Sequence, residues 1–139
     1  YVNKEENKRD NDFSDMLSQL NVLLVEDNEI NTMIALDVLH SMNINTDCAV
    51  NGKEALNKVK HGTYDLVLMD IQMPEMDGIE ATKAIREFCT EEELPIIALT
   101  TNVLPEEIEH YRSIGMTDHI GKPFESKELK AAIKKIRNL

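Results

Sequence analysis

Short, almost purely apolar runs alternate along this chain with longer stretches in which apolar residues recur every three or four positions. The clearest runs lie at residues 21–25, 65–69 and 95–99. Continuous apolar runs of this length are typical of strands buried on both faces of a parallel sheet. Weaker runs at residues 45–50 and 116–121 predict two more strands, so the pattern indicates five strands in all.

The stretches between and after these runs predict helices at residues 28–42, 52–61, 78–88, 105–114 and 125–137. Asn28 can cap the first helix, and Gly62 and Gly115 can stop the second and the fourth. Pro105 suits the first turn of the fourth helix. The apolar residues at helical spacing are Ile30, Met33, Ile34, Val38 and Met42 in the first helix, Ala55, Leu56 and Val59 in the second, Ile79, Ile85 and Phe88 in the third, Ile108, Tyr111 and Ile114 in the fourth, and Leu129, Ala132, Ile133 and Ile136 in the last.

This alternation of strands and helices determines the expected fold class. Strands joined by helices form a parallel sheet, and right-handed crossovers place the helices on both of its faces. We therefore predict an α/β fold built on a doubly wound, five-stranded parallel sheet.

The first 20 residues depart from this pattern, and we predict that they form a polar linker. The first dozen are mostly Asn, Lys, Glu, Asp and Arg, which are too polar to bury. The few apolar residues that follow predict no more than a helical turn or two. Because the chain begins with Tyr1 rather than Met, we expect it to be a segment of a longer protein, with one domain over residues 21–139.

Composition limits the possible functions. The 139 residues are 42% apolar, as expected for one globular domain with a core. The net charge of −11 argues against nucleic-acid binding, which relies on cationic side chains. No run approaches the ~20 apolar residues of a membrane helix, and no signal peptide opens the chain. We therefore expect a cytoplasmic domain without membrane contact, whose parent protein could be membrane-anchored. Cys48 and Cys89 lack metal-site spacing and are expected to be free thiols.

Residues able to do chemistry follow four of the five predicted strands. Glu26 and Asp27 follow the first strand, and Asp70 follows the third. Thr100 follows the fourth, and Lys122 follows the fifth. In a parallel sheet these strand ends share one edge, where ligands bind. Three carboxylates packed together repel one another and need a compensating cation, and oxygen-rich sites suit Mg²⁺. The pattern therefore predicts a Mg²⁺ site, with Asp70 as a nucleophile.

Five short motifs carry a resemblance to a known family. They are Val25-Glu26-Asp27-Asn28, Met69-Asp70-Ile71-Gln72-Met73-Pro74, Met76-Asp77-Gly78, Leu99-Thr100 and Gly121-Lys122-Pro123-Phe124. In this order and at this spacing they resemble the receiver domains of two-component response regulators, and the resemblance covers residues 21–139. It implies a flavodoxin-like (βα)5 sheet with the strand order 2-1-3-4-5.

The resemblance also implies a function. Asp70 would accept a phosphoryl group from a phosphohistidine of a histidine kinase or of a histidine phosphotransfer protein. The domain would catalyse its own aspartyl phosphorylation and dephosphorylation, with Lys122 and Thr100 contacting the phosphoryl oxygens. The implied Mg²⁺ ligands are Glu26, Asp27, Asp70 and the backbone carbonyl of Gln72.

Members of the family switch between two conformations, and two positions here depart from their usual pattern. His119 occupies the place where many receivers carry Tyr or Phe as a switch residue, and Thr101 stands where a small residue is usual. We expect Thr100 to move toward a phosphoryl oxygen and to carry the loop at residues 102–105 with it. A downstream partner would then bind the face formed by the fourth helix, the fifth strand and the last helix. The resemblance further implies a cis Lys122–Pro123 peptide bond.

Several alternatives remain open at this point. The run at residues 26–31, together with Gln72-Met73-Pro74, favours the C-terminal receiver of a hybrid histidine kinase, whose parent would itself be a kinase. A stand-alone or N-terminal receiver is the alternative. A degenerate receiver would act only as an interaction module. A phosphatase of the haloacid dehalogenase type would need a second aspartate where Gln72 stands. A flavodoxin would need a phosphate-binding loop where residues 26–29 are acidic.

Overall fold

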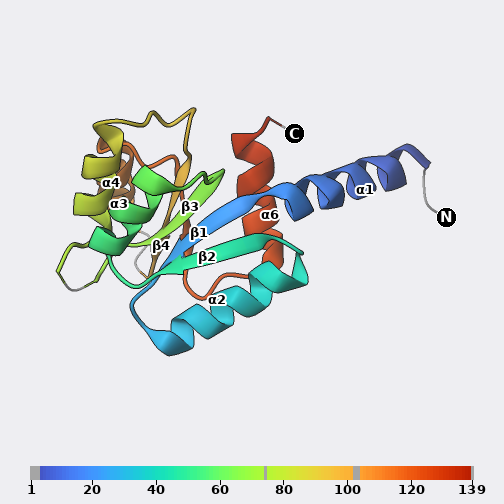
Figure 1. Ribbon diagram of the computed structural model, residues 1–139. Helices are drawn as coiled ribbons and strands as arrows, with labels where there is room; N and C mark the ends of the chain where they lie inside the picture. The colour runs from blue at the N-terminus through green and yellow to red at the C-terminus, as the bar shows by residue number, and fades with distance from the viewer. Residues whose placement is uncertain (1–3, 74, 102–103, 139) are drawn as a thin grey trace.

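Strands and helices alternate along residues 4–73, 75–101 and 104–138, which are the residues that this computed structural model describes (Figure 1). The elements are α1 (Lys4–Gln19), β1 (Asn21–Val25), α2 (Glu29–Ser41), β2 (Asn45–Ala49), α3 (Gly52–His61), β3 (Leu66–Asp70), α4 (Gly78–Arg86), β4 (Ile96–Thr100), α5 (Pro105–Ser113), β5 (Asp118–Gly121) and α6 (Ser126–Ile136). Three residues with sequence-based predictions lie outside the described ones. They are Pro74, from one of the five motifs, and Asn102 and Val103, from the predicted switch loop.

The five strands form one parallel sheet in the order β2-β1-β3-β4-β5. This order confirms the predicted α/β class and the 2-1-3-4-5 arrangement. The order reverses at β1, because β2 lies on one side of it and β3 on the other. Ligands of such sheets bind outside the carboxyl ends of the strands at this point, and there the chain places β1 and β3 side by side.

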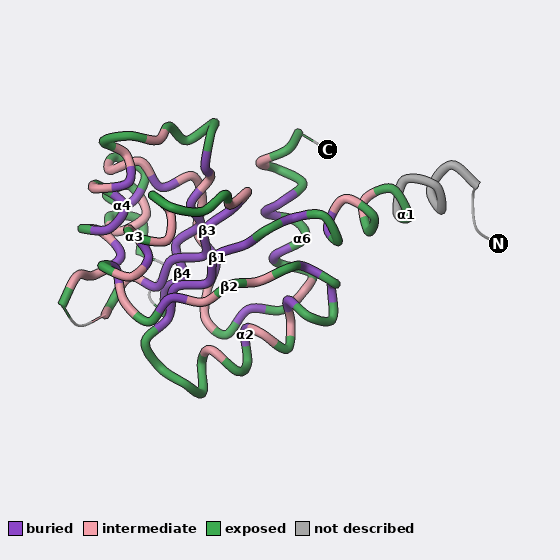
Figure 2. Tube along the Cα trace, viewed as in Figure 1, coloured by how far each residue is buried: buried purple, intermediate pink, exposed green. Residues whose placement is uncertain are grey.

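Two apolar layers cover the two faces of the sheet. Alternate residues of the strands point to opposite faces, so Val22 and Leu24 join one layer while Leu23 and Val25 join the other. Helices α1, α2 and α6 pack in the first layer, and helices α3, α4 and α5 pack in the second. Figure 2 shows the buried residues concentrated along the strands and on the helix sides that face them. The sheet edge that carries the polar residues is thus held by cores on both sides.

Strand ends differ from the predicted ones by one residue at two important places. β3 and β4 continue through Asp70 and Thr100, which the apolar runs had placed just after the strands. Both residues are buried. Backbone pairing with β4 and β5 extends the strands, because Asp70 pairs with Leu99 and Thr100 pairs with Gly121. Their backbones are therefore fixed by the sheet.

The buried faces of two helices were not as the periodicity indicated. α4 ends at Arg86, so Phe88 lies beyond it and is 46% exposed, and its prediction as a core residue was wrong. In α2, Ala35 and Leu39 face the core, while the predicted apolar positions Ile30 and Met33 are exposed. Helical spacing fixes the width of an apolar stripe, but when a helix carries more apolar residues than it can bury, contact with the sheet selects among them.

Most of the predicted polar linker forms a long helix, whereas the sequence predicted no more than a helical turn or two there. α1 runs from Lys4 to Gln19 and projects away from the sheet toward its N-terminal end (Figure 1). Its last turn is part of the domain, because Leu17 and the following Leu20 are buried in the same apolar layer as α2 and α6. Phe13 also packs there, with the ammonium of Lys134 lying 4.9 Å from its ring centroid. The core thus extends into residues that composition had assigned to the linker.

Two further sequence expectations concern membrane segments and cysteines. Among the described residues, no helix combines the length and apolar character that crossing a bilayer requires. Cys48 and Cys89 are both free thiols, as predicted.

Candidate phosphoacceptor site

Four strands bring their polar residues to one edge of the sheet. Glu26 and Asp27 follow β1, Asp70 ends β3, and Lys122 follows β5. The backbone N–H of Lys122 donates to the Thr100 carbonyl, which holds the Lys122 side chain beside the end of β4. The Lys122–Pro123 peptide bond is cis, as the resemblance implied.

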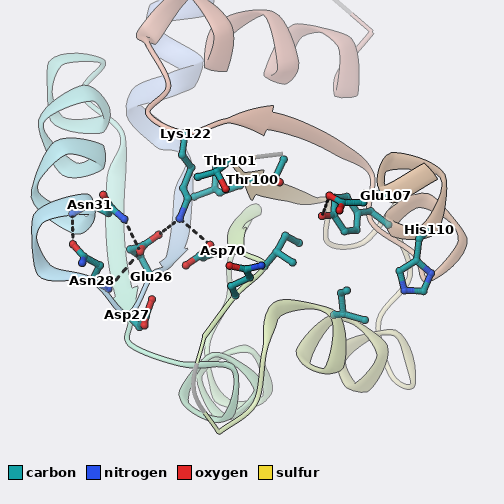
Figure 3. A pocket seen from close by; sticks show the side chains of 15 residues that line it. Glu26, Asp27, Asn28, Asn31, Asp70, Thr100, Thr101, Glu107, His110 and Lys122 are labelled. Atoms are coloured by element: carbon teal, nitrogen blue, oxygen red, sulfur yellow. Dashed lines mark hydrogen bonds and ion pairs between the residues drawn. The ribbon is translucent and has the colours of Figure 1, made fainter. Parts of the chain in front are cut away.

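An ion pair joins three of these residues across the edge. The Nζ of Lys122 lies 2.9 Å from Oδ1 of Asp70 and 3.3 Å from Oε2 of Glu26 (Figure 3). The side chains of Asp70 and Glu26 are only 5% and 2% exposed, so their charges have little water around them. Lysine therefore supplies the positive charge that the two carboxylates need in the metal-free protein.

The other oxygen of Glu26 is held from the α2 side. Its Oε1 accepts hydrogen bonds from the Asn28 backbone at 3.4 Å and from Nδ2 of Asn31 at 3.3 Å (Figure 3). Asn28 also caps α2, as predicted, by accepting from the Asn31 backbone at 3.0 Å. Sequence reasoning did not assign Asn31 to the site. The available signal was a second polar residue one turn after the N-cap, which returns to the same side of the helix.

The three carboxylates form a site that can hold a metal ion. One oxygen from each of Glu26, Asp27 and Asp70 lies within 4.8 Å of the others. Burial and the charges of Glu26 and Asp27 raise the pKa of Asp70 to about 6, although the hydrogen bond and charge of Lys122 act in the opposite direction. Burial is the largest of these causes, and the three clustered carboxylates outnumber the single Lys122 ammonium that pairs with them. Buried, charged oxygen ligands fit a hard divalent cation such as Mg²⁺.

The neighbouring carboxylates also shift the pKa of Lys122, and they favour its charged form. Burial alone would lower its pKa, but the hydrogen bond and charge of Asp70, together with Glu26, raise the pKa of Lys122. An ammonium with a raised pKa stays protonated at neutral pH. The site therefore contains a permanent cation next to the candidate nucleophile.

Asp70 opens onto a cavity of about 430 Å³. In addition to the residues above, the cavity wall includes Ile71, Gln72, Ile79, Leu99, Thr100, Thr101, Glu107, His110 and Tyr111. Thr100, Thr101 and Gln72 were singled out from the sequence, whereas Glu107, His110 and Tyr111 were not assigned to the site. These three come from α5, and the rotation that turns them toward the strand edge is set by tertiary packing.

The predicted switch residues Thr100 and His119 lie in different surroundings. Thr100 is 5% exposed and lines the cavity. His119, on β5, lines a separate small hollow with Ile108 and Tyr111, and its Nδ1 lies 3.7 Å from the Asp118 carboxylate. The structure thus brings Glu26, Asp27, Asp70, Gln72, Thr100 and Lys122 to one cavity. It places His119 on the wall of the other hollow.

Comparison with known proteins agrees with this geometry. The sequence model of the protein family described as the response regulator receiver domain matches residues 22–134. The aerobic respiration control sensor protein ArcB of Escherichia coli K12 is 45% identical over 120 residues, covering 86% of this chain and 15% of ArcB. Hybrid signal transduction histidine kinase G of Dictyostelium discoideum is 38% identical over 118 residues, covering 83% of this chain and 3% of that kinase. The chain therefore spans a small part of these relatives.

Solved structures of similar fold include two receiver domains. That of the sensor histidine kinase PA1611 of Pseudomonas aeruginosa, which has a magnesium ion coordinated in its active-site cleft, aligns with a TM-score of 0.77 and 33% identity over 86% of this chain and 98% of its own. The Ssk1 receiver of Saccharomyces cerevisiae was crystallised with the histidine phosphotransfer protein Ypd1. It aligns with a TM-score of 0.76 and 34% identity over 84% of this chain and 87% of its own. These matches set aside the dehalogenase-type and flavodoxin alternatives. With its sheet order, its strand-edge carboxylates and its lysine, this chain belongs to the response regulator receiver domain family.

Proposed function

We propose that Asp70 is the phosphoacceptor of a phosphorelay and takes its phosphoryl group from a phosphohistidine. The observation that carries this proposal is a carboxylate that is 95% buried, faces an open cavity and is held by Lys122 at 2.9 Å. One carboxylate oxygen of Asp70 forms a bond to phosphorus as the P–N bond to the donor imidazole breaks. The electron pair of that bond stays on the imidazole nitrogen.

Residues around Asp70 supply the remaining parts of this reaction. Glu26, Asp27, Asp70 and the Gln72 carbonyl would hold Mg²⁺, which when bound neutralises charge on the phosphoryl oxygens. The Lys122 ammonium is already fixed beside Asp70 and can pair with a phosphoryl oxygen without reorganisation. The Thr100 hydroxyl donates to another phosphoryl oxygen and so makes the conformation depend on phosphorylation.

Incubation with acetyl phosphate and Mg²⁺ tests the acceptor directly. We expect a mass gain of one phosphoryl group in the wild-type domain and none in Asp70→Asn, because an amide is a poor nucleophile. Asp37→Asn, which changes an exposed carboxylate on α2, should keep the gain. The folded environment disfavours charge at Asp70, so Asp70→Asn should unfold at the same or a higher denaturant concentration at pH 7 without metal. Full labelling of Asp70→Asn would refute the assignment, and a wild-type domain without labelling would favour a degenerate receiver.

The phosphoryl donor is proposed to dock beside the cavity on α2. Ile30, Met33 and Ile34 are 68%, 66% and 44% exposed there. Ile34 also lines a shallow hollow shared with Glu26 and Lys122. Exposed apolar side chains beside a reactive group are typical of a protein contact. The fitting partner is a histidine phosphotransfer protein or a histidine kinase, and we place this domain in a hybrid histidine kinase, with a separate response regulator as the alternative.

The variant Met33→Asp tests whether this face of α2 binds the donor protein without taking part in the phosphorylation reaction itself. It adds a charge at the centre of the exposed patch, so phosphotransfer from a phosphorylated histidine phosphotransfer protein that labels the wild-type domain should slow by roughly tenfold. Labelling by acetyl phosphate should remain unchanged, because the small donor needs no docking surface. Asp37→Asn on the same helix serves as the control with unchanged rates for both donors. Equal rates of protein-mediated transfer for Met33→Asp and wild type would exclude this face.

A downstream partner is proposed to bind the face of α5, β5 and α6, because α5 supplies part of the cavity wall. The domain itself is expected to lie in the cytoplasm without membrane contact, and both expectations stay predictions.

A further inference from the structure

Asn31, in the first turn of α2, directs its side-chain amide toward the carboxylate of Glu26. Its Nδ2 lies 3.3 Å from Oε1 of Glu26 (Figure 3). Asn31 lines the phosphoacceptor cavity and also the shallow hollow that Ile34 and Lys122 border. It therefore lies between the proposed metal ligands and the helix on which the phosphoryl donor is proposed to dock.

The chemistry of the two groups fixes which end of the Asn31 amide faces Glu26. An ionised carboxylate only accepts hydrogen bonds, so the amide nitrogen faces it and donates. The start of the helix holds Asn31 in this place, because its backbone N–H donates to Oδ1 of Asn28 at 3.0 Å. The backbone N–H of Asn28 itself donates to Oε1 of Glu26 at 3.4 Å. Asn28 and Asn31 thus join the beginning of α2 to one oxygen of Glu26.

Glu26 is held from two opposite sides. Its Oε2 lies 3.3 Å from Nζ of Lys122, while its Oε1 is held from α2. These contacts are at the long end of hydrogen-bond distances, so the orientation of the carboxylate depends on all of them. The side chain of Glu26 is only 2% exposed, and little water is present to replace a lost donor. Without the Asn31 amide, the Lys122 ammonium would attract both oxygens and turn the carboxylate away from the other two acidic residues.

We propose that Asn31 is a positioning residue, which holds the Glu26 carboxylate in the orientation that completes the Mg²⁺ site. One oxygen from each of Glu26, Asp27 and Asp70 lies within 4.8 Å of the others. The partners that orient metal ligands contribute strongly to metal affinity, and Asn31 acts in this way through Glu26. This inference rests on the proposed phosphoacceptor function and adds a residue of α2 that sets its affinity for Mg²⁺.

The Mg²⁺ affinity of the metal-free domain, measured by calorimetry, tests the proposal. Asn31→Ala removes the amide at an exposed position, and we expect Mg²⁺ to bind roughly tenfold more weakly, as when other residues that orient metal ligands are lost. The denaturation midpoint without metal should hardly change, because alanine favours the helix more than asparagine does and so offsets the lost hydrogen bond. A purely structural role would instead change the midpoint and leave the Mg²⁺ affinity as it is.

Thr32→Val is the matched control in the same turn of α2. It removes a hydroxyl that donates to the Asn28 carbonyl at 2.9 Å and does not contact Glu26, so its Mg²⁺ affinity should equal that of wild type. A second comparison uses Glu26→Ala. In that background Asn31→Ala should have no effect on Mg²⁺ affinity, because the carboxylate to be oriented is absent. Amide chemical shifts during the Mg²⁺ titration report the weak binding expected of these two proteins.

Two results would overturn the proposal. One is an unchanged or tighter Mg²⁺ affinity in Asn31→Ala, since tighter binding means that Asn31 only stabilises the metal-free carboxylate. The other is an equal loss of affinity with and without the Glu26 carboxylate, which indicates a general effect on the helix. Failure of the wild-type domain to bind Mg²⁺, with or without beryllofluoride, would refute the proposed metal site itself, and so the two failures are distinguishable.

Discussion

Lys122 shows how one residue determines the state of the site. Two nearly buried carboxylates share its ammonium, and the pKa of Asp70 is nevertheless raised to about 6. Three carboxylates cluster beside this single lysine, so the metal-free site has excess negative charge with the lysine in place. The excess charge destabilises the metal-free protein and favours binding of a cation. Removal of this lysine should therefore lower the stability of the metal-free protein and raise its affinity for the metal.

Lys122→Ala tests this coupling. Loss of charge-assisted hydrogen bonds to Asp70 and Glu26 should lower the free energy of unfolding by about 2 kcal/mol without metal. Added Mg²⁺ should then stabilise Lys122→Ala more than wild type, because the ion replaces the missing charge. Denaturant titrations with and without Mg²⁺ measure both effects, and Lys53→Ala on the exposed side of α3 is the control. An identical Mg²⁺ effect in all three proteins would contradict this account.

Residue identities predicted most of the candidate site, whereas side-chain orientations did not follow from sequence. Glu26, Asp70 and Lys122 could be found because each directly follows or ends an apolar strand run, and parallel strands bring such ends together. Asn31 and Tyr111 lie on helices, where a shift of one position rotates a side chain by about 100°. The hydrogen bond from Asn31 to Glu26 and the place of Tyr111 in the cavity wall depend on how the helices pack on the sheet, which local patterns do not contain.

At the scale of elements, Gly78 controls how closely α4 approaches the phosphoacceptor. A Cβ added at Gly78 would overlap the backbone carbonyl oxygen of Asp70 and lie 3.0 Å from Cγ of Met69. The Gly78 N–H also donates to the Ile71 carbonyl at 3.0 Å, which ties the start of α4 to the end of β3. The glycine thus permits a backbone contact that no side chain would tolerate.

Gly78→Ala should therefore displace the start of α4 from Asp70. We expect a loss of about 1–3 kcal/mol in the free energy of unfolding, as for other overpacked sites, together with weaker labelling by acetyl phosphate. Gly121→Ala is the matched control, because a Cβ there would lie 3.9 Å from the nearest atom, the Thr100 carbonyl oxygen. Chemical denaturation and phosphoryl mass gain would be measured for both variants. Equal stability of the two variants would argue against the close approach.

For the whole molecule, the alternation of runs predicted the sheet because the strands are short, the three central ones (β1, β3 and β4) are largely apolar, and one helix separates each strand from the next. The polar composition of residues 1–20 concealed α1, whose stabilising contacts come from Leu17 and Leu20. A few buried residues at the end of a charged helix suffice to join it to the core. Composition alone thus missed a helix whose apolar residues, Phe13, Met16 and Leu17, all lie in its second half.

The switch itself is a property of the whole molecule and can be tested by amide chemical shifts. Thr100 ends β4, lines the cavity together with Tyr111 of α5, and accepts through its carbonyl from the Lys122 backbone after β5. Movement of its side chain should therefore disturb α5 and β5 together. With beryllofluoride and Mg²⁺ we expect shift changes around Asp70 and also between Glu106 and Ile120.

Thr100→Ala provides the control for this experiment. It should keep the changes around Asp70, because the carboxylate still binds the mimic, and lose those on α5 and β5. A partner that contacts this face would then bind the two states with a difference of typically ~1–3 kcal/mol. Changes confined to the Asp70 cavity in the wild-type domain would refute transmission through Thr100. Distant changes that persist in Thr100→Ala would point to a route through Lys122 and the end of β5, since Lys122 contacts both Asp70 and the end of β4.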